Sequence, residues 1–302
     1  FLPLQPISIT KGENMKVSVG IWGCGNVGNA TARVFEDLCP ALVKVYKYDI
    51  DPSKSNASPD RVVECDFIFL CLPTPMKITG EISLEYLESA LKEIRKLAKH
   101  SGENRKIIII RSTTVSGSTD KFASEYTEFD FAFCPEFLRE AHAVIDALNP
   151  GRIVIGTNDD RTSKLVEALF ILAFAPKVRY VHLTRIEAET LKYFANTHRF
   201  VQVLLSNELF FFCQKIGVDY ERVQEILSLD EVIGKFTNVP GHDGDFGAGG
   251  RCLPKDTSAL AYIARTKDSP LLILEKAIEV NDKVRINKDW FQIKGAVESY
   301  KY

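Results

Sequence analysis

Cys252 has the strongest potential for covalent chemistry in this sequence, because its surroundings differ from those of the other cysteines. It lies in the run GGRCLPKD, where glycines and charged residues precede an expected helix start. Lys255 and the free N–H groups of a helix N-terminus both favour a thiolate over a thiol. We therefore predict a nucleophilic cysteine. The alternative is a buried structural cysteine, which is the commoner fate of this residue type.

Glu189, Lys192 and Asn196 form a second group of polar residues. Their spacings of three and four place them on one face of an expected helix. The neighbouring Tyr193 and Phe194 suggest that this helix is buried on most sides, where a lysine needs a partner. We expect Glu189 to hold Lys192 in place. The alternative is an ordinary solvated face of charged residues.

A glycine motif, GCGNVG, follows the first expected strand and opens an expected helix, which is the context of a dinucleotide-binding turn. Gly23 permits the tight turn, Gly25 lets the backbone reach a pyrophosphate, and Gly28 permits close packing of helix on strand. Asn26 and Val27 lie at the helix N-terminus, whose N–H groups can bind phosphates. The alternative is a strand-to-helix turn without a ligand.

Asp49 ends the second expected strand, 21 residues after Gly28. A carboxylate at this place can accept hydrogen bonds from both ribose hydroxyls and repels a 2′-phosphate, so we expect NAD in preference to NADP. Asp51 is the competing candidate, but we expect it to cap the turn that begins at Pro52.

Short apolar runs alternate with longer amphipathic runs from residue 17 to residue 183. This alternation predicts an α/β fold with a Rossmann-type, doubly wound parallel sheet that has helices on both faces. The strands are apolar throughout, as expected when both faces of a sheet are covered. The expected strands are 17–22, 43–49, 67–72, 107–112, 129–134, 152–156 and 178–183, and the expected helices are 27–38, 84–100, 118–126 and 160–173.

The pattern changes after residue 184. No Pro or Gly interrupts residues 185–216, and Gly217 is a natural stop, which predicts a helix of about 50 Å. We therefore expect an NAD-binding Rossmann domain at residues 1–184, followed at 185–302 by a long central helix and a helical domain for dimerisation or substrate. Further features are expected helices at 219–229, 254–264 and 270–283 and a glycine-rich loop from Gly234 to Gly250.

The composition argues against several classes of protein. Thirty-eight basic and forty acidic residues among 302 give a net charge of −2, so there is no electrostatic reason to expect nucleic acid or an anionic membrane as a partner. Seven cysteines without a CxxC pair argue against a disulfide framework or a metal site and favour a reducing, cytoplasmic compartment. We expect no membrane span and no signal peptide, but a loose leader before the first strand.

Seven segments of the chain together resemble the UDP-glucose and GDP-mannose dehydrogenase family over roughly residues 16–285, and the UDP-glucose 6-dehydrogenases are the most similar branch. GGRCLPKDT is the most specific segment, and CPEFLRE and the Lys192–Asn196 helix reinforce it. The segments are GCGNVG, FLCLPTP, RSTTVSGST, CPEFLRE, NPGRIVIG, EAETLKYFANT and GGRCLPKDT, in this order.

The resemblance implies a four-electron oxidation of a sugar C6 alcohol to a carboxylate, with NAD as cofactor. Cys252 would attack the intermediate aldehyde to give a thiohemiacetal and then a thioester, which water hydrolyses. Lys192 would stabilise negative charge on the C6 oxygen, with Asn196 as a further donor.

The resemblance also implies roles for residues around these groups. Asp256 and Thr113 would hold the water of proton transfer, and Glu140 and Glu136 would act as a base or orient the substrate. Further implied contacts are Pro73 and Thr74 to the cofactor, and Phe137, Leu138, Arg139, Gly249 and Gly250 to the substrate.

The family implies a nucleotide-sugar substrate and a homodimer built around the 185–216 helix. Of Phe210, Phe211 and Phe212, at least one should face outward unless the helix is covered on all sides, which is the alternative. Two departures from the family pattern are expected: the link from residue 51 to residue 66 is short, and the C-terminal nucleotide-sugar-binding domain is absent.

Four functions stay open. Oxidation of UDP-glucose to UDP-glucuronate leads, and a GDP-mannose or UDP-N-acetylmannosamine dehydrogenase is its nearest rival. A 3-hydroxy-acid dehydrogenase shares the sheet and a Lys–Asn helix but has no use for Cys252. A non-catalytic NAD-binding subunit would bind NAD without turnover.

Overall fold

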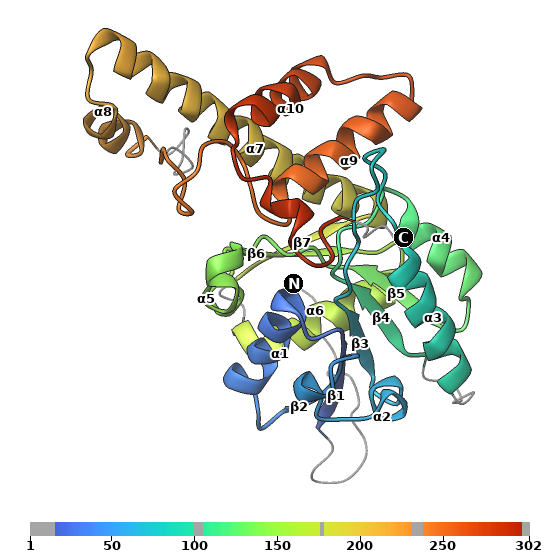
Figure 1. Ribbon diagram of the computed structural model, residues 1–302. Coiled ribbons are helices and arrows are strands. Elements are labelled where there is room, and N and C mark those ends of the chain that lie inside the picture. Colours follow the sequence, from blue (N-terminus) through green and yellow to red (C-terminus); the bar gives the residue numbers. More distant parts are fainter. Residues whose placement is uncertain (1–15, 99–104, 176–177, 231–237, 298–302) are drawn as a thin grey trace.

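The computed structural model describes residues 16–98, 105–175, 178–230 and 238–297. The expected leader, and Gly234 of the expected glycine-rich loop, lie outside these ranges. The described chain has an α/β part and a helical part, which the long helix α7 joins (Figure 1).

The described residues form a seven-stranded sheet with the order β2-β1-β3-β4-β5-β6-β7. Neighbours from β2 to β5 are parallel, and each expected strand is present to within two residues at its ends. The expected α/β fold class is therefore confirmed. The strands are β1 (Val17–Trp22), β2 (Val43–Tyr48), β3 (Phe67–Leu70), β4 (Ile107–Ile110), β5 (Asp130–Phe133), β6 (Arg152–Gly156) and β7 (Arg179–Leu183).

The prediction of an entirely parallel sheet is wrong at one place. β6 pairs antiparallel with β5 through Phe133 and Gly156, and β7 then runs parallel to β6. The link from β5 to β6 contains η2 (Glu140–His142) and α5 (Ala143–Leu148), and α5 packs against α1. This link does not cross from one end of the strands to the other. β6 therefore starts at the end of the sheet where β5 finishes, and it runs in the opposite direction.

Helices cover both faces of the sheet, and successive strand residues point to opposite faces. Phe67 and Phe69 join the core under α1 and α6, whereas Ile68 and Leu70 join the core under α2, α3 and α4. Burial of both faces accounts for the unbroken apolar runs. These helices are α1 (Asn26–Leu38), α2 (Pro59–Val63), α3 (Glu85–Leu97), α4 (Ser118–Glu125) and α6 (Asp160–Phe174).

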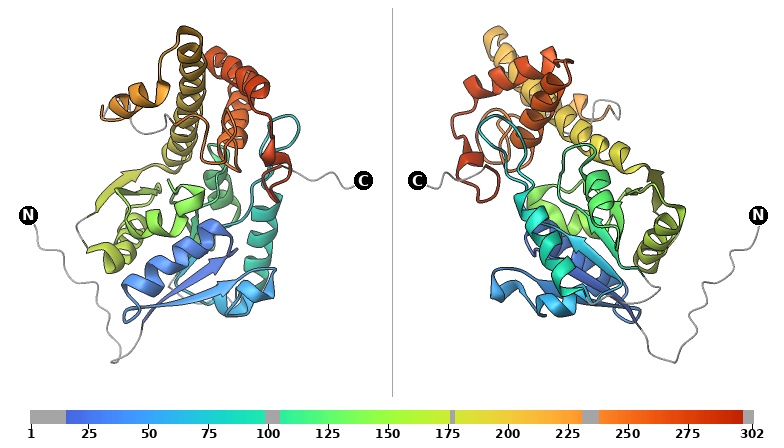
Figure 2. Two further views of the ribbon diagram at one scale, coloured as in Figure 1. Left: turned by 60° about the vertical axis from the view of Figure 1, so that its left-hand side comes forward. Right: turned by 90° about the vertical axis from the view of Figure 1, so that its right-hand side faces the viewer.

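Helix α7 (Arg185–Ile216) has the predicted bounds. Thr184 and Glu187 form a capping box at its start, and Gly217 adopts the left-handed conformation at its end. One part of α7 packs on β5, β6 and α4. The part beyond the sheet carries the other helices, as Figures 1 and 2 show: α8 (Tyr220–Leu227), α9 (Leu253–Thr266) and α10 (Leu272–Val284).

The helical part also reaches back to the sheet. After α10 and η4 (Asp289–Phe291), the chain lies beside the loop that follows β3, where Met76 N donates to Ala296 O at 2.9 Å. This loop extends towards α9 (Figure 2). The carboxyl ends of β1 and β3 flank the place where the strand order reverses, and such a crevice is where doubly wound sheets bind ligands.

Candidate active site

The glycine turn between β1 and α1 has the shape that a dinucleotide requires. Gly23 has φ of 93°, and a Cβ at Gly28 would overlap the carbonyl oxygen of Gly23. At Gly25, by contrast, an added Cβ would meet no heavy atom within 4 Å. The first and third glycines therefore serve the packing of the turn, whereas the second leaves its backbone open to a ligand.

Asp49 lies directly against this turn. Its Oδ2 accepts from Cys24 N at 2.6 Å and its Oδ1 accepts from Asp51 N at 2.9 Å. Asp51 caps η1 (Pro52–Lys54) through Ser53 N, as predicted. The Asp49 carboxylate suits the ribose hydroxyls of NAD, and the open glycine backbone beside it suits the pyrophosphate.

The other residues expected at the cofactor differ in exposure. Asn26 is exposed and donates to Glu140 Oε1 at 3.4 Å, and Val27 packs against the core. Thr74 is buried, and a Cβ added at Gly295 would lie 3.0 Å from the Cβ of Pro73. Their contact with NAD therefore stays a proposal.

Lys192 and Glu136 form a buried ion pair. Lys192 Nζ donates to Glu136 Oε1 and to Glu136 O, both at 2.7 Å. Burial alone raises the pKa of Glu136, but the charge and hydrogen bonds of Lys192 outweigh burial, so the pKa is lowered. For Lys192, burial lowers the pKa, but the charges of Glu136 and Asp256 outweigh burial, so its pKa is raised. Both groups are therefore charged.

Asn196, one turn further along α7, is joined to the cysteine helix. Asn196 Nδ2 donates to Asp256 Oδ2 at 2.5 Å, and Lys255 Nζ donates to Asp256 Oδ1 at 2.6 Å. These three side chains are buried. Lys192 and Asn196 of the predicted polar stripe are thus buried and paired, so this part of α7 is not a solvated face.

Cys252 occupies the N-cap position of α9, and its backbone oxygen accepts from Asp256 N at 2.9 Å. The prediction that its surroundings favour a thiolate is wrong for this state of the protein. Burial raises the pKa of Cys252 to about 12 and Asp256 adds to the rise, whereas Lys192 lowers it only in part. The free thiol is therefore the resting form.

The prediction that Glu189 holds Lys192 is also wrong. Glu189 accepts from Thr114 Oγ1, from Gly117 N, and from both Thr119 N and Thr119 Oγ1, at 2.6 to 3.0 Å. It therefore fastens α7 to the N-terminus of α4, where free N–H groups attract a carboxylate. Glu136, 56 residues before Lys192, is the partner that spacing along one helix could not reveal.

The other predicted residues lie around this centre. Thr113 is buried in the segment after β4. Glu140 is exposed and lies close to Gly250, since a Cβ at Gly250 would be 3.6 Å from Glu140 Oε2. Phe137 and Leu138 are half-buried and Arg139 is exposed. Their catalytic and substrate roles stay proposals.

A polar anchor missed at the sequence level holds the loop before Cys252. Asn207 Oδ1 accepts from Gly247 N at 3.0 Å, Asn281 Oδ1 accepts from Ala248 N at 2.8 Å, and Asp289 accepts from Gly250 N at 3.0 Å. Asn207, Asn281 and Asp289 belong to no recognisable motif, and residues of these types are usually found on protein surfaces. The sequence therefore contains no signal that they hold this loop.

Arg285 completes this anchor. Its side chain is almost fully buried and pairs with Asp243 at 2.6 Å and with Asp289 at 3.1 Å. A Cβ at Gly249 would overlap the Arg285 guanidinium, so this glycine serves the close approach of a protein group. Substrate contact by Gly249 and Gly250 stays a proposal, and Gly250 N already has Asp289 as its acceptor.

Three further observations concern metal ligands, membrane-spanning helices and disulfides. Within the described ranges, no group of three His, Cys, Asp or Glu side chains is arranged to hold a metal ion. The same ranges contain no helix that is long and apolar enough to cross a bilayer. All seven cysteines lie in the described ranges and are free.

The fold and the glycine turn define a Rossmann-type, dinucleotide-binding α/β protein. The model of the NAD binding domain of the UDP-glucose/GDP-mannose dehydrogenase family matches residues 53–173, and the model of the family's central domain matches residues 186–283. The chain belongs to this family, with NAD as its cofactor.

Individual relatives agree with this assignment. The chain is 31% identical over 268 residues to the UDP-glucose 6-dehydrogenase TuaD of Bacillus subtilis, which covers 86% of this chain and 55% of that protein. It is 32% identical over 230 residues to a GDP-mannose 6-dehydrogenase of Pseudomonas putida, which covers 72% and 50%. The chain spans about half the length of the curated relatives it matches.

Solved structures are similar over most of the chain. A UDP-glucose dehydrogenase of Pyrobaculum islandicum superposes with a TM-score of 0.74 at 25% identity, over 89% of this chain and 68% of that one. A 3-hydroxyisobutyrate dehydrogenase of Mycobacterium tuberculosis has a TM-score of 0.66 at 16% identity, over 89% and 94%, and shares the fold alone.

Proposed function

We propose that the chain oxidises the C6 alcohol of a nucleotide sugar to the carboxylate, with UDP-glucose as the leading substrate and UDP-glucuronate as the product. The observation that carries this proposal is Cys252 at the start of α9, beside the buried Lys192–Glu136 and Asn196–Asp256 pairs. Oxidation of an alcohol to an aldehyde needs only a base and a hydride acceptor. A thiol is needed for the second oxidation, in which the aldehyde becomes a hydride donor.

The glycine turn and Asp49 would hold NAD, and two NAD molecules bound in succession would each accept one hydride, one for each oxidation. After the first oxidation, the S–H of Cys252 adds across the aldehyde C=O: sulfur bonds to C6 and the proton ends on oxygen. This route fits a thiol whose pKa is raised to about 12. Lys192 stabilises the negative charge that develops on that oxygen.

Loss of hydride from C6 and of a proton from oxygen converts the thiohemiacetal to a thioester. Water then cleaves the C–S bond, which releases the carboxylate and restores the thiol. Asp256 and Thr113 hold this water, Asn196 is a further donor to the C6 oxygen, and Glu136 and Glu140 take up protons or orient the substrate. The Glu136 carboxylate is ionised beside Lys192, as an acceptor must be.

The experiment follows NADH absorbance with purified protein, NAD and UDP-glucose. We expect two NADH per sugar and loss of this yield in Cys252→Ser. Cys213→Ser, at a half-buried position near the far end of α7, is the matched control and should keep the yield. Absence of NADH with every nucleotide sugar, while NAD binding is intact, would leave the non-catalytic subunit as the function.

A substrate panel separates the enzymatic rivals. GDP-mannose and UDP-N-acetylmannosamine are the first alternatives, since relatives of both names share this fold. A 3-hydroxy acid that gives one NADH, unaffected by Cys252→Ser, would assign the chain to the other class with this fold.

We also propose a homodimer through α7. This helix exposes several large apolar side chains along its length, and Phe212 of the predicted phenylalanine triplet is 57% exposed. Exposed apolar surface of this kind marks an interaction site. Phe212→Glu should shift the sedimenting species towards monomer, whereas Ile50→Glu, at a position 83% exposed in the sheet part, should not. A monomeric wild-type protein at micromolar concentration would contradict the dimer.

The seven free cysteines support a reducing compartment, and we place the enzyme in the cytoplasm.

A further inference from the structure

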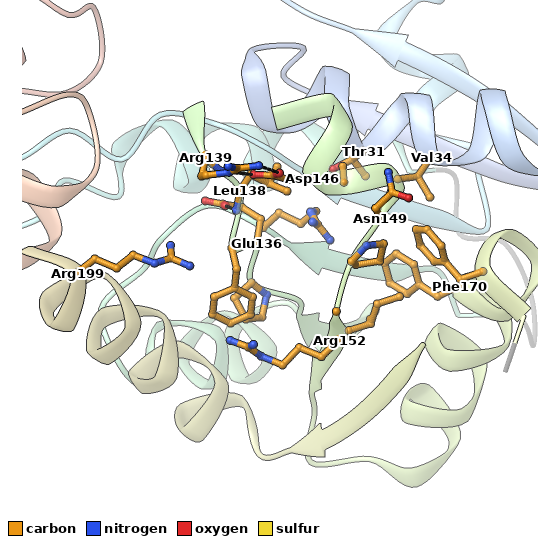
Figure 3. A pocket seen from close by; sticks show the side chains of 18 residues that line it. Thr31, Val34, Glu136, Leu138, Arg139, Asp146, Asn149, Arg152, Phe170 and Arg199 are labelled. Atoms are coloured by element: carbon orange, nitrogen blue, oxygen red, sulfur yellow. Dashed lines mark hydrogen bonds and ion pairs between the residues drawn. The ribbon is translucent and has the colours of Figure 1, made fainter. Parts of the chain in front are cut away.

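A pocket of about 330 Å³ lies between α1, α5, α6, β6 and the middle of α7. Figure 3 shows side chains from all these elements around one space. From α1 it is lined by Thr31 and Val34, which lie beyond the glycine turn, so the pocket is separate from the turn that holds the NAD phosphates. Its volume is at the lower end of the range of small-molecule sites.

The pocket is apolar on one side and basic on the other. Val34, Ile153, Phe170 and Phe174 form the apolar side. Arginines supply the basic side, and Figure 3 shows Arg139, Arg152 and Arg199 reaching it from separate elements. The arginines that line the pocket are Arg111, Arg139, Arg152 and Arg199.

Only two carboxylates line the same space, and both are already engaged. Asp146 accepts from Arg139 Nη2 at 2.7 Å and from Arg139 Nε at 3.0 Å. Glu136 accepts from Lys192 Nζ and from Leu138 N, both at 2.7 Å. Four arginines and two carboxylates thus line the pocket, so its lining carries a formal excess of positive charge.

The positive groups are close enough to repel one another. Burial lowers the pKa of Arg199, the carboxylates Glu136 and Asp146 oppose this effect, and the charges of Arg152 and Arg139 add to it. The Arg152 guanidinium lies 4.3 Å from the centroid of the Phe137 ring, and Arg111 Nε is buried without a hydrogen-bond partner among the described residues. Converging cations with an unused buried donor are what an anion site presents before its ligand arrives.

We propose that this pocket, named here the arginine pocket, binds a phosphate or diphosphate group. Guanidinium groups match phosphate oxygens in geometry and donate to them in pairs. The group could come from a free phosphate compound or from the diphosphate of the nucleotide sugar. Because Phe137, Leu138 and Arg139 belong both to the pocket and to the proposed substrate site, the inference rests in part on the proposed function.

The test is titration calorimetry of the full chain with inorganic phosphate and with diphosphate. Saturating NAD is present throughout, so that the glycine turn cannot bind the added anion. We expect saturable binding, weakened at least about tenfold in Arg152→Gln and in Arg199→Gln, the loss of one charge-assisted contact. Arg33→Gln, which removes an exposed arginine of α1 that pairs with Asp37, is the matched control and should bind as the wild type does.

The outcomes of this test distinguish the two possible sources of the phosphate group. If UDP-glucose competes with diphosphate and the two variants raise KM, the pocket holds the substrate's diphosphate. If diphosphate and UDP-glucose bind together, the ligand is a separate phosphate compound. Both results support the site. Absence of saturable binding, or equal binding in all variants, would overturn it. Arg152 is exposed, so its variant keeps the test decisive even if Arg199→Gln is unstable.

Calorimetry does not depend on turnover, which keeps the two proposals distinguishable. Phosphate binding without any NADH would overturn only the proposed function. Two NADH per sugar without phosphate binding would overturn only the arginine pocket.

Discussion

Glu140 stands between the glycine turn and the loop that leads to Cys252, yet the two regions on either side of it are built differently. The turn is one continuous segment, and its fit to a dinucleotide depends on backbone shape and on the absence of side chains at three positions. The cysteine site is assembled from separate segments, which charged and polar side chains join in a buried space. A contiguous backbone site should tolerate changes around it, whereas a side-chain network should fail when one member is lost.

The largest effect is expected at the network's nucleophile. Cys252→Ser should lower the production of the carboxylate by at least about 10³-fold, because a hydroxyl is a far weaker nucleophile and the second oxidation depends on it. Quantification of the sugar acid after a timed reaction checks this. An unchanged yield would place the chemistry elsewhere and remove the contrast between the two regions.

The next effect concerns stability. Lys192→Met should lower the free energy of unfolding by about 3–5 kcal/mol, because Glu136 is left charged and buried without its partner. Urea denaturation measures the loss. The double variant with Glu136→Gln should recover much of it, since no uncompensated charge is left. Equal losses in the single and double variants would show that packing, and not charge pairing, holds this region.

The glycine turn should separate folding from cofactor binding. Gly28→Ala should cost about 1–3 kcal/mol of stability, because its Cβ overlaps the Gly23 carbonyl. Gly25→Ala has free space and should fold as the wild type does, but it should weaken NAD at least about tenfold by blocking the backbone. Fluorescence titration with NAD and thermal unfolding measure the two quantities. Tight NAD binding by Gly25→Ala would show that the open backbone is not the contact surface.

The smallest effect is a pH dependence. Burial raises the pKa of Cys252 to about 12. The rate at which iodoacetamide alkylates Cys252 should therefore keep rising with pH and reach no plateau below about pH 10. An ordinary thiol, with a pKa near 8.5, would level off by then. The raised pKa also means that the neutral thiol contributes stability that is fully present below about pH 8.5 and is lost progressively as pH rises from there to about 12. Mass spectrometry of the Cys252 peptide gives the rate, and a plateau near pH 8 would mean that Lys192 prevails over burial.

The difference between a site within one continuous segment and a site assembled from distant segments also decides what could be predicted from the sequence. The bounds of α7 were predictable because Thr184, Glu187 and Gly217 are local signals at the two ends of one helix. The glycine turn and Asp49 were predictable for the same reason. The reversal of β6 was not, since it depends on the course of a connection and not on the apolar pattern of the strand.

The site's pairings show where local reasoning ends. The face shared by Lys192 and Asn196 follows from helical spacing, but their partners Glu136 and Asp256 lie about sixty residues away in either direction. Glu189 was assigned the wrong partner because Lys192 is near in sequence, whereas the N-terminus of α4 is near in space. The raised pKa of Cys252 could not be predicted either, because burial is a property of the whole fold.

The contact between Gly249 and Arg285 also restricts how this protein can change over time. A side chain at position 249 has no room while a full guanidinium occupies the space, and a shorter residue at position 285 alone would leave Asp243 and Asp289 without their cation. A side chain at position 249 therefore requires the guanidinium to move, and we expect the two positions to vary as a pair. Across descendants of this sequence, they should therefore be inherited together or replaced together.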